Sequence, residues 1–150
     1  MKKDEFYMKE ALKEAEKASG RDEVPVGAVI VHNGAIIARA HNQIKMLKDP
    51  TAHAEIIAIT QAANYLQNER LIGCSMYVTI EPCSMCAGAM VLARIGNLIY
   101  ASDDPKAGAC GSVVNIANQG KLNHKIRVKK GVLEDDASSL MKEFFRKKRR

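Results

Sequence analysis

The stretch Thr51-Ala52-His53-Ala54-Glu55 is followed, after a predicted helix and strand, by Glu81-Pro82-Cys83-Ser84-Met85-Cys86. Together the two stretches supply one histidine, a carboxylate two residues later, and two cysteines separated by two residues. Imidazole and thiolate groups are the usual protein ligands of zinc. The two stretches therefore predict a metal site, and the segments around them predict how the chain folds to build it.

Each stretch is expected at the beginning of a helix. Thr51 would cap a helix that ends near residue 67, with His53 and Glu55 in its first turn. Pro82 suits the start of a second helix, in which Cys83 and Cys86 share one face. The positive ends of both helices would then meet at one point and favour the thiolates that zinc requires.

Three protein ligands leave one tetrahedral position of zinc open, which is typical of catalytic zinc sites. One Zn²⁺ per chain, bound by His53, Cys83 and Cys86, would lower the pKa of a bound water to about 7. Glu55 is then the predicted catalytic residue, because it can take a proton from the water and pass it to the substrate, first to a ring nitrogen and then to the leaving amine.

Two other interpretations of the cysteines stay open at this point. A Cys-x-x-Cys pair can be a redox pair. A closed structural zinc site would recruit a fourth ligand, such as Cys74, Cys110 or His124. None of these three has the spacing of paired ligands, and this favours the open, catalytic site.

The other segments predict an α/β fold. Helices alternate with strands after an initial hairpin, which turns at Asn33-Gly34. This order is typical of a sandwich with a mixed sheet, and a chain of 150 residues is expected to form one domain, 1–150. Apolar patterns predict strands over 24–31, 35–40, 76–80, 97–101 and 126–133, and further helices over 4–19, 113–118 and 134–150.

The positive charge is concentrated near the C-terminus. The formal net charge is +6; residues 1–124 contain 13 Lys+Arg and 13 Asp+Glu, whereas residues 125–150 contain 10 and 4. A local basic excess is typical of a surface that binds polyanions, but a solvated tail that aids solubility would have the same composition. No secretory pattern and no membrane-spanning run is found, so a cytoplasmic protein with free thiols is expected.

The order His-Ala-Glu and then Pro-Cys-Ser-Met-Cys resembles the signature of the cytidine deaminase-like superfamily. Further stretches, spread over nearly the whole chain, are similar to the bacterial tRNA adenosine deaminases within it. These stretches are Glu23–Ala28, Asp49–Glu55, Tyr77–Cys83, Cys86–Met90, Asp104–Lys106 and Phe144–Arg146.

The resemblance implies hydrolysis of adenosine to inosine at the wobble position of a tRNA anticodon, with a zinc-bound hydroxide and Glu55 as proton shuttle. It implies a three-layer α/β/α sandwich with a five-stranded mixed sheet. It also implies a homodimer and an anticodon stem-loop as partner; no membrane and no protein partner are predicted. The target nucleoside would contact Asn42 and the backbone around Ala54. The residues implied to grip the anticodon loop are Asp103, Asp104, Lys106, Asn123, His124, Phe145 and Arg149.

One position departs from the family pattern. Lys125 stands where the family often has arginine, and lysine keeps the charge but loses bidentate phosphate geometry. The same metal motif would also serve a deaminase of free bases such as guanine or cytosine, and an RNA-binding zinc module without catalysis is a further alternative.

Two features of the sequence bear on these partners. Residues 83–93 carry no charged side chain, so this helix is expected to be buried on every side, by a second subunit or within the monomer. Phe144 is expected in the core, whereas Phe145 is expected to contact the unstacked bases of an RNA loop.

Overall fold

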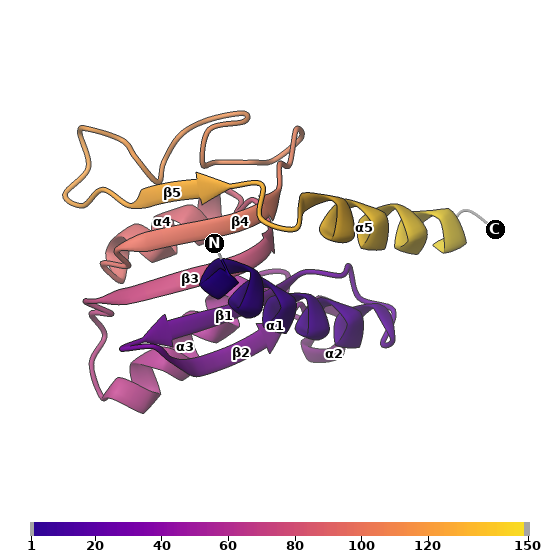
Figure 1. Cartoon of the computed structure of the whole chain (residues 1–150), viewed down its shortest axis with the longest axis horizontal. Coiled ribbons are helices and arrows are strands. Elements are labelled where there is room, and N and C mark those ends of the chain that lie inside the picture. Colours follow the sequence, from indigo (N-terminus) through magenta and orange to yellow (C-terminus); the bar gives the residue numbers. More distant parts are fainter. Residues whose placement is uncertain (1, 149–150) are drawn as a thin grey trace.

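A computed structural model describes residues 2–148, and within this range five strands form one mixed sheet with helices on both faces (Figure 1). This confirms the predicted α/β/α sandwich. The strands are β1 (Gly27–His32), β2 (Ala35–His41), β3 (Cys74–Ile80), β4 (Asn97–Ser102) and β5 (Arg127–Lys130). The helices are α1 (Lys2–Ser19), α2 (Ile44–Leu47), α3 (Ala54–Leu66), α4 (Ser84–Leu92) and α5 (Glu134–Lys148).

The sheet has the strand order β2-β1-β3-β4-β5. β1 pairs antiparallel with β2 and β3, whereas β3, β4 and β5 run parallel. The predicted hairpin at Asn33-Gly34 joins β1 and β2, and both residues have the positive φ of a type I′ turn. The parallel strands end at one edge, where β3 leads through Pro82 into α4.

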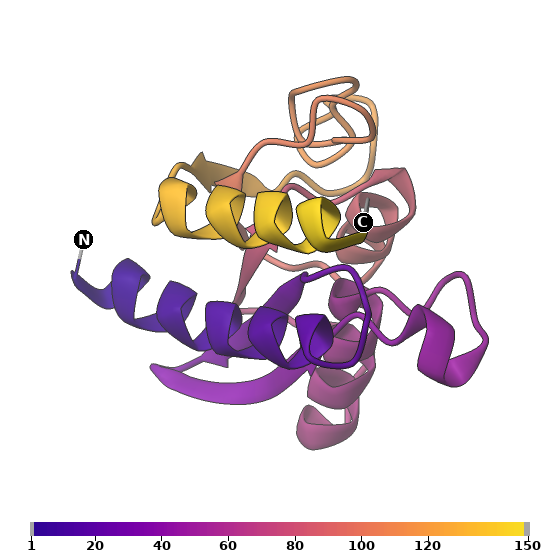
Figure 2. The same ribbon diagram turned by 90° about the vertical axis from the view of Figure 1, so that its right-hand side faces the viewer.

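Both faces of the sheet are apolar because helices cover both. Helices α1 and α5 lie side by side on one face (Figure 2), where Val29 and Tyr77 form a buried cluster with Met8 of α1. Helices α3 and α4 cover the other face, where Ile30 packs in a cluster with Ala58 of α3. Alternate residues of a strand point to opposite faces, so a strand covered on both sides is apolar along its whole length.

Helix α1 packs unusually close to β1. A Cβ atom on Gly27 would lie 2.0 Å from the carbonyl oxygen of Ala11 and 2.5 Å from the amide nitrogen of Ala15. Real Cβ atoms do not approach backbone atoms this closely. The absence of a side chain at Gly27 therefore sets the distance between α1 and the sheet.

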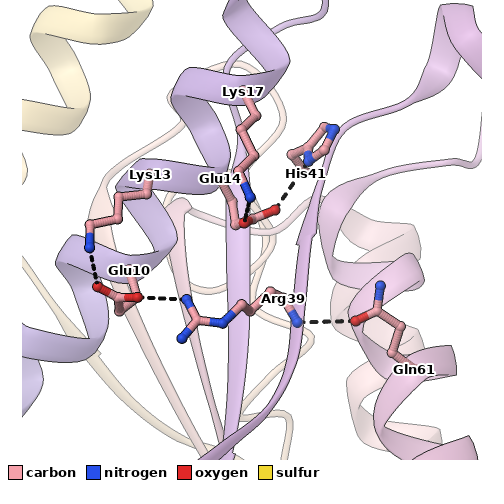
Figure 3. Close-up of polar contacts among 7 residues, drawn as sticks. All are labelled: Glu10, Lys13, Glu14, Lys17, Arg39, His41 and Gln61. Carbon is pink, nitrogen blue, oxygen red and sulfur yellow. Dashed lines mark hydrogen bonds and ion pairs between the residues drawn. The ribbon is translucent and has the colours of Figure 1, made fainter.

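Polar contacts fasten α1 and α3 to β2 (Figure 3). Arg39 donates through Nη1 to Glu10 at 2.6 Å, and its backbone N–H donates to Gln61 of α3 at 3.0 Å. Oε1 of Glu14 lies 3.1 Å from Nδ1 of His41. These contacts fix the end of β2, from which the chain continues into the site described below.

Some predicted boundaries were wrong. The first strand begins at Gly27 instead of residue 24: the Val26 N–H bonds the Val24 carbonyl at 2.8 Å in a tight turn, and Pro25 has no N–H to donate to a sheet. Residues 113–118 do not form a helix, because Cys110 and Asn115 form a β-bridge there. The last strand covers only 127–130.

The beginning of the metal-bearing helix also differs from the prediction. Thr51 does not cap it; the Thr51 N–H and hydroxyl both donate to Asp49, at 2.8 and 2.7 Å. Helix α3 begins at Ala54, with His53 in the cap position. Among residues 2–148, no helix is both long enough and apolar enough to span a bilayer.

Candidate metal centre and its pocket

His53, Cys83 and Cys86 meet where the N-termini of two helices converge. His53 occupies the cap position of α3, Cys83 that of α4, and Cys86 lies in the first turn of α4. Nδ1 of His53 is 3.7 Å from Sγ of Cys83 and 3.6 Å from Sγ of Cys86, and the three atoms lie within 4.8 Å of one another. In the described part of the chain, no other set of His, Cys, Asp or Glu ligands gathers in this way.

These separations fit a tetrahedral zinc ion. Zinc binds sulfur at about 2.3 Å and imidazole nitrogen at about 2.0 Å, which places the two ligand atoms about 3.5 Å apart. The Cys86 thiol forms a hydrogen bond with Cys83, which lowers the pKa of Cys83 to about 5 and raises the pKa of Cys86. The helix N-termini add partial positive charge, and this favours thiolate ligands.

Glu55 is the buried carboxyl of this site. Its side chain belongs to the first turn of α3, the residue is 3% exposed, and burial raises the pKa of the carboxyl to about 7. Its Oε1 is buried and has no hydrogen-bond partner among the described residues. A buried polar oxygen normally has a partner, so this atom fits a site that receives a further polar group such as a metal-bound water.

A cavity of about 250 Å³ opens beside these groups. It is smaller than the range of roughly 300–1,000 Å³ of pockets for drug-sized ligands, and suits a single base. Half of the lining residues are apolar, and the other half carry polar, charged or metal-ligating groups. The lining residues are Val24, Val26, Asn42, Ile44, His53, Glu55, Ile80, Glu81, Cys83, Asp104, Ala107 and Met141.

Asn42 links this cavity to helix α3. The residue is 5% exposed, and its Oδ1 accepts a hydrogen bond from the backbone N–H of Ala54 at 2.8 Å. The Ala54 N–H is therefore already bound within the chain. Because Oδ1 is held, the orientation of the amide is fixed and Nδ2 is the group that can donate to a ligand.

The other residues that the family resemblance implies to bind substrate differ in exposure and in whether they line the cavity. Of these, Asp104 lines the cavity. Asp103 is exposed and accepts a hydrogen bond from the Tyr100 hydroxyl at 2.9 Å, and Nε2 of His124 donates to the Ile95 carbonyl at 2.7 Å. Lys106, Asn123 and Phe145 are exposed and do not line the cavity; Arg149 lies outside the described residues.

Two buried glutamates of the site were not assigned a role from the sequence. Glu23 is 3% exposed and accepts the backbone N–H groups of Lys45 and Met46 at 3.2 and 2.9 Å. Glu81 is 2% exposed and lines the cavity. For Glu81 a signal was present, since it is a charged residue between an apolar run and Pro82, whereas Glu23 follows the polar Arg21-Asp22 and has no such signal. The short helix α2, which begins with Ile44 of the lining, was also missed.

Helix α4 has one apolar face uncovered in the single chain, so of the two covers expected from the sequence, a second subunit or the monomer itself, the monomer does not supply this one. Leu92 is 81% exposed, and no atom lies within 4 Å of a Cβ built on Gly88. A shallow hollow of about 480 Å³ runs along this face. It is lined by Ile56, Ser84, Met85, Gly88, Ala89, Val91, Leu92 and Leu122.

Known proteins resemble this chain over almost its whole length. A family model described as MafB19-like deaminase matches residues 2–149. A tRNA-specific adenosine deaminase of Bacillus subtilis (strain 168) is 47% identical over 150 residues, which cover 100% of this chain and 93% of the relative.

Solved structures share the same fold. One, from work on A-to-I editing by tRNA:A34 deaminases at the wobble position of transfer RNA, superposes with a TM-score of 0.87 at 46% identity. The match covers 90% of this chain and 98% of the other. A guanine deaminase from Nitrosomonas europaea superposes with a TM-score of 0.81 at 25% identity, over 93% of this chain and 83% of the other.

Proposed function

Because the chain belongs to the bacterial tRNA-specific adenosine deaminases, within the MafB19-like deaminases, we propose that it hydrolyses adenosine to inosine at the wobble position of a tRNA anticodon. The observation that carries this proposal is the buried carboxyl of Glu55, with an unpartnered oxygen, beside three metal-ligating atoms and a cavity of base size. We expect residues 1–150 to act as one deaminase domain, in the cytoplasm because the proposed substrate is a tRNA.

His53, Cys83 and Cys86 would hold one zinc ion, which would supply a Lewis acid that lowers the pKa of a water in its open position. Glu55 would accept one proton from the attacking water and donate it to N1 of the adenine ring as the C6–O bond forms; it would then take the second proton, from the new C6 hydroxyl, and donate it to the amine as the C6–N6 bond breaks. A carboxyl whose pKa is about 7 exchanges protons readily near neutral pH. Water and adenosine are consumed, and inosine and ammonia are formed.

Binding of the target base requires that it leaves its neighbours in the RNA. An anticodon loop presents unpaired bases that can be turned out and inserted into a protein pocket. Asn42 would donate from Nδ2 to the inserted nucleoside, because Oδ1 is occupied by the Ala54 N–H. The surrounding loop would contact the exposed Lys106, Asn123 and Phe145, together with Asp103, Asp104, His124 and Arg149.

The test is sequencing of total tRNA after treatment with the purified protein. Adenosine at the first anticodon position should be read as guanosine after treatment with the wild type. Glu55→Ala should keep the zinc content of the wild type but form no inosine. Turnover retained in this variant would remove Glu55 from its role.

The likeness to a guanine deaminase favours a second candidate, a deaminase of free purine bases. The cavity is large enough for a base alone, and the metal chemistry would be the same. Ammonia release from guanine, cytosine and an anticodon stem-loop separates the two candidates. Release from free guanine without release from the stem-loop would favour the second candidate.

A homodimer would cover the uncovered face of α4. This apolar hollow includes the strongly exposed Leu92 and the side-chain-free Gly88, which lets another backbone approach closely. We expect sedimentation velocity to give a dimer for the wild type and a monomer for Leu92→Glu. An unchanged dimer in this variant would place the interface elsewhere.

A further inference from the structure

Glu81 joins the chain at the start of α4 to a loop that lines the same cavity. It precedes Pro82 and the predicted ligand Cys83 in the chain, and its carboxylate is almost completely buried. The metal chemistry proposed above gives this carboxylate no role. A buried charge needs strong compensation by hydrogen bonds, and here every partner comes from one loop.

Residues 104–112 form this loop, called here the Glu81-held loop, and they donate four hydrogen bonds to the carboxylate. Oε1 accepts the Asp104 N–H at 3.0 Å and the Ser112 hydroxyl. Oε2 accepts the N–H groups of Cys110 and Ser112 at 3.0 and 3.1 Å. Burial alone would raise the pKa of Glu81, but these four donors lower it, so the group is a carboxylate at neutral pH.

The Glu81-held loop forms one wall of the cavity, through Asp104 and Ala107. A fifth contact joins it to the metal-bearing segment, since the Ala109 N–H donates to the Pro82 carbonyl at 2.9 Å. The fit is close at Gly108. A Cβ there would lie 2.4 Å from the Glu81 carboxyl and 2.6 Å from the Asp104 carbonyl oxygen.

We propose that Glu81 is a positioning residue, which fixes the Glu81-held loop against the start of α4 so that its wall matches the nucleotide inserted beside the metal. It does not touch the reacting atoms; it acts through the backbone of Asp104 and Ala107. This inference rests on the proposed function, because the ligand it positions for is the anticodon nucleotide.

Glu81→Gln tests the proposal with little change of shape. An amide placed with NH₂ at the Oε1 position still accepts the Cys110 and Ser112 N–H groups and can donate to the Ser112 hydroxyl. The NH₂ group and the Asp104 N–H are both donors, so the hydrogen bond to Asp104 is lost. A hydrogen bond to a charged group contributes enough that we expect KM for an anticodon stem-loop to rise about tenfold. We expect kcat to change less than about threefold, because binding outside the reacting atoms is affected.

Two further variants control the result. Ser112→Ala removes only the hydroxyl donor and keeps three N–H donors, so KM should stay within about twofold of the wild type. Gly108→Ala disturbs the same carboxyl from the loop side and should raise KM as Glu81→Gln does. If Glu81→Gln does not fold, Gly108→Ala decides the question. Zinc content should equal that of the wild type in all three variants.

An unchanged KM in Glu81→Gln would overturn the proposal. Loss of zinc with a matching loss of kcat would also overturn it, because Glu81 would then support the metal ligands. Amide hydrogen exchange separates this result from a failure of the proposed function. The Asp104 amide should exchange at least about tenfold faster in Glu81→Gln, while Cys110 stays protected. Inactivity of the wild type on the stem-loop would refute the proposed function, and the exchange rates would still decide whether Glu81 holds the loop.

Discussion

Oδ1 of Asn42 accepts the backbone N–H of Ala54 at 2.8 Å, so a residue that follows β2 caps the helix that carries Glu55. The cap comes from 12 residues earlier in the chain. One side chain therefore holds the start of α3 with its oxygen and faces the cavity with its nitrogen.

Substitution of Asn42 should separate these two roles. Asn42→Asp keeps an acceptor for the Ala54 N–H but removes the donor to the nucleoside, so we expect near-normal thermal stability and at least about a hundredfold loss of inosine formation. Asn42→Ala should lose activity and also about 1 kcal/mol of unfolding free energy, as other lost caps do. Stem-loop deamination and thermal unfolding measure the two effects. Full activity in Asn42→Asp would show that Nδ2 donates nothing to the substrate.

Removal of the metal is expected to stop the reaction and weaken the fold. His53, Cys83 and Cys86 join α3 to α4, so a chelator should lower the melting temperature, and added zinc should restore both stability and activity. We expect one zinc per chain by elemental analysis. Cys86→Ala should lose the metal, whereas Cys110→Ala, which removes a buried thiol outside the group, should keep it. Metal loss from Cys110→Ala would indicate a fourth ligand.

The two adjacent phenylalanines of α5 offer a matched pair. Phe144 is 8% exposed, so Phe144→Ala should cost about 3 kcal/mol of unfolding free energy. Phe145 is 42% exposed, so Phe145→Ala should cost less than about 1 kcal/mol. If Phe145 stacks on an RNA base, its loss should weaken stem-loop binding by about tenfold. Denaturant unfolding and a binding titration report the effects, and equal binding by Phe145→Ala and wild type would place the RNA away from α5.

The close approach of α1 to β1 predicts a severe effect at Gly27. Gly27→Ala places a methyl group against the backbone of Ala11 and Ala15, which cannot move without displacing the helix. We expect a loss of about 3 kcal/mol or more of unfolding free energy. Gly20→Ala is the control, because its Cβ would make only ordinary contacts at 3.6 Å. Similar stability of both variants would mean that α1 shifts without cost.

The contacts of Asp4 predict a pH dependence of stability. Asp4 accepts hydrogen bonds from Lys129 and from the Tyr77 hydroxyl, each at 2.6 Å. Burial alone would raise the pKa of Asp4, but these two donors lower it below its ordinary value. The stability that Asp4 contributes is therefore complete above the unfolded pKa of about 3.9 and is lost as the pH falls through the lower, folded pKa.

Asp4→Asn tests this dependence. It should lower the unfolding free energy by about 1 kcal/mol near neutral pH, because Lys129 is half exposed and its interaction is screened. Urea unfolding from about pH 7 to about pH 2.5 should show the difference from wild type shrinking in acid. A difference that is constant over this range would contradict the assignment.

The sequence predicted the features that depend on local pattern. The central strands β1, β3 and β4 are apolar on both faces, and the turn at Asn33-Gly34 needs positive φ at two residues; both signals are read directly from neighbouring residues. The gathering of His53 with Cys83 and Cys86 followed from placing each motif at a helix start. The family resemblance supplied the fold of the whole chain.

What the sequence did not predict depends on partners distant in the chain. Thr51 is a residue type that often caps helices, but here it donates to Asp49. Asn42 instead accepts the Ala54 N–H at the start of α3. Helix α2 has only four residues and gains its N-terminal hydrogen bonds from Glu23, more than 20 residues earlier. Such contacts leave no periodic pattern in the sequence. A buried carboxylate from a distant part of the chain binds N–H groups that would otherwise have no partner.

The carboxylate of Glu23 binds the N–H groups of Lys45 and Met46, so the chain beside Ile44 already has its shape before any ligand arrives. The conformational entropy of this segment is lost when the protein folds and not when it binds. A preorganised rim of this kind lets a ligand as small as one nucleotide, which makes few contacts, bind without first ordering the backbone around it.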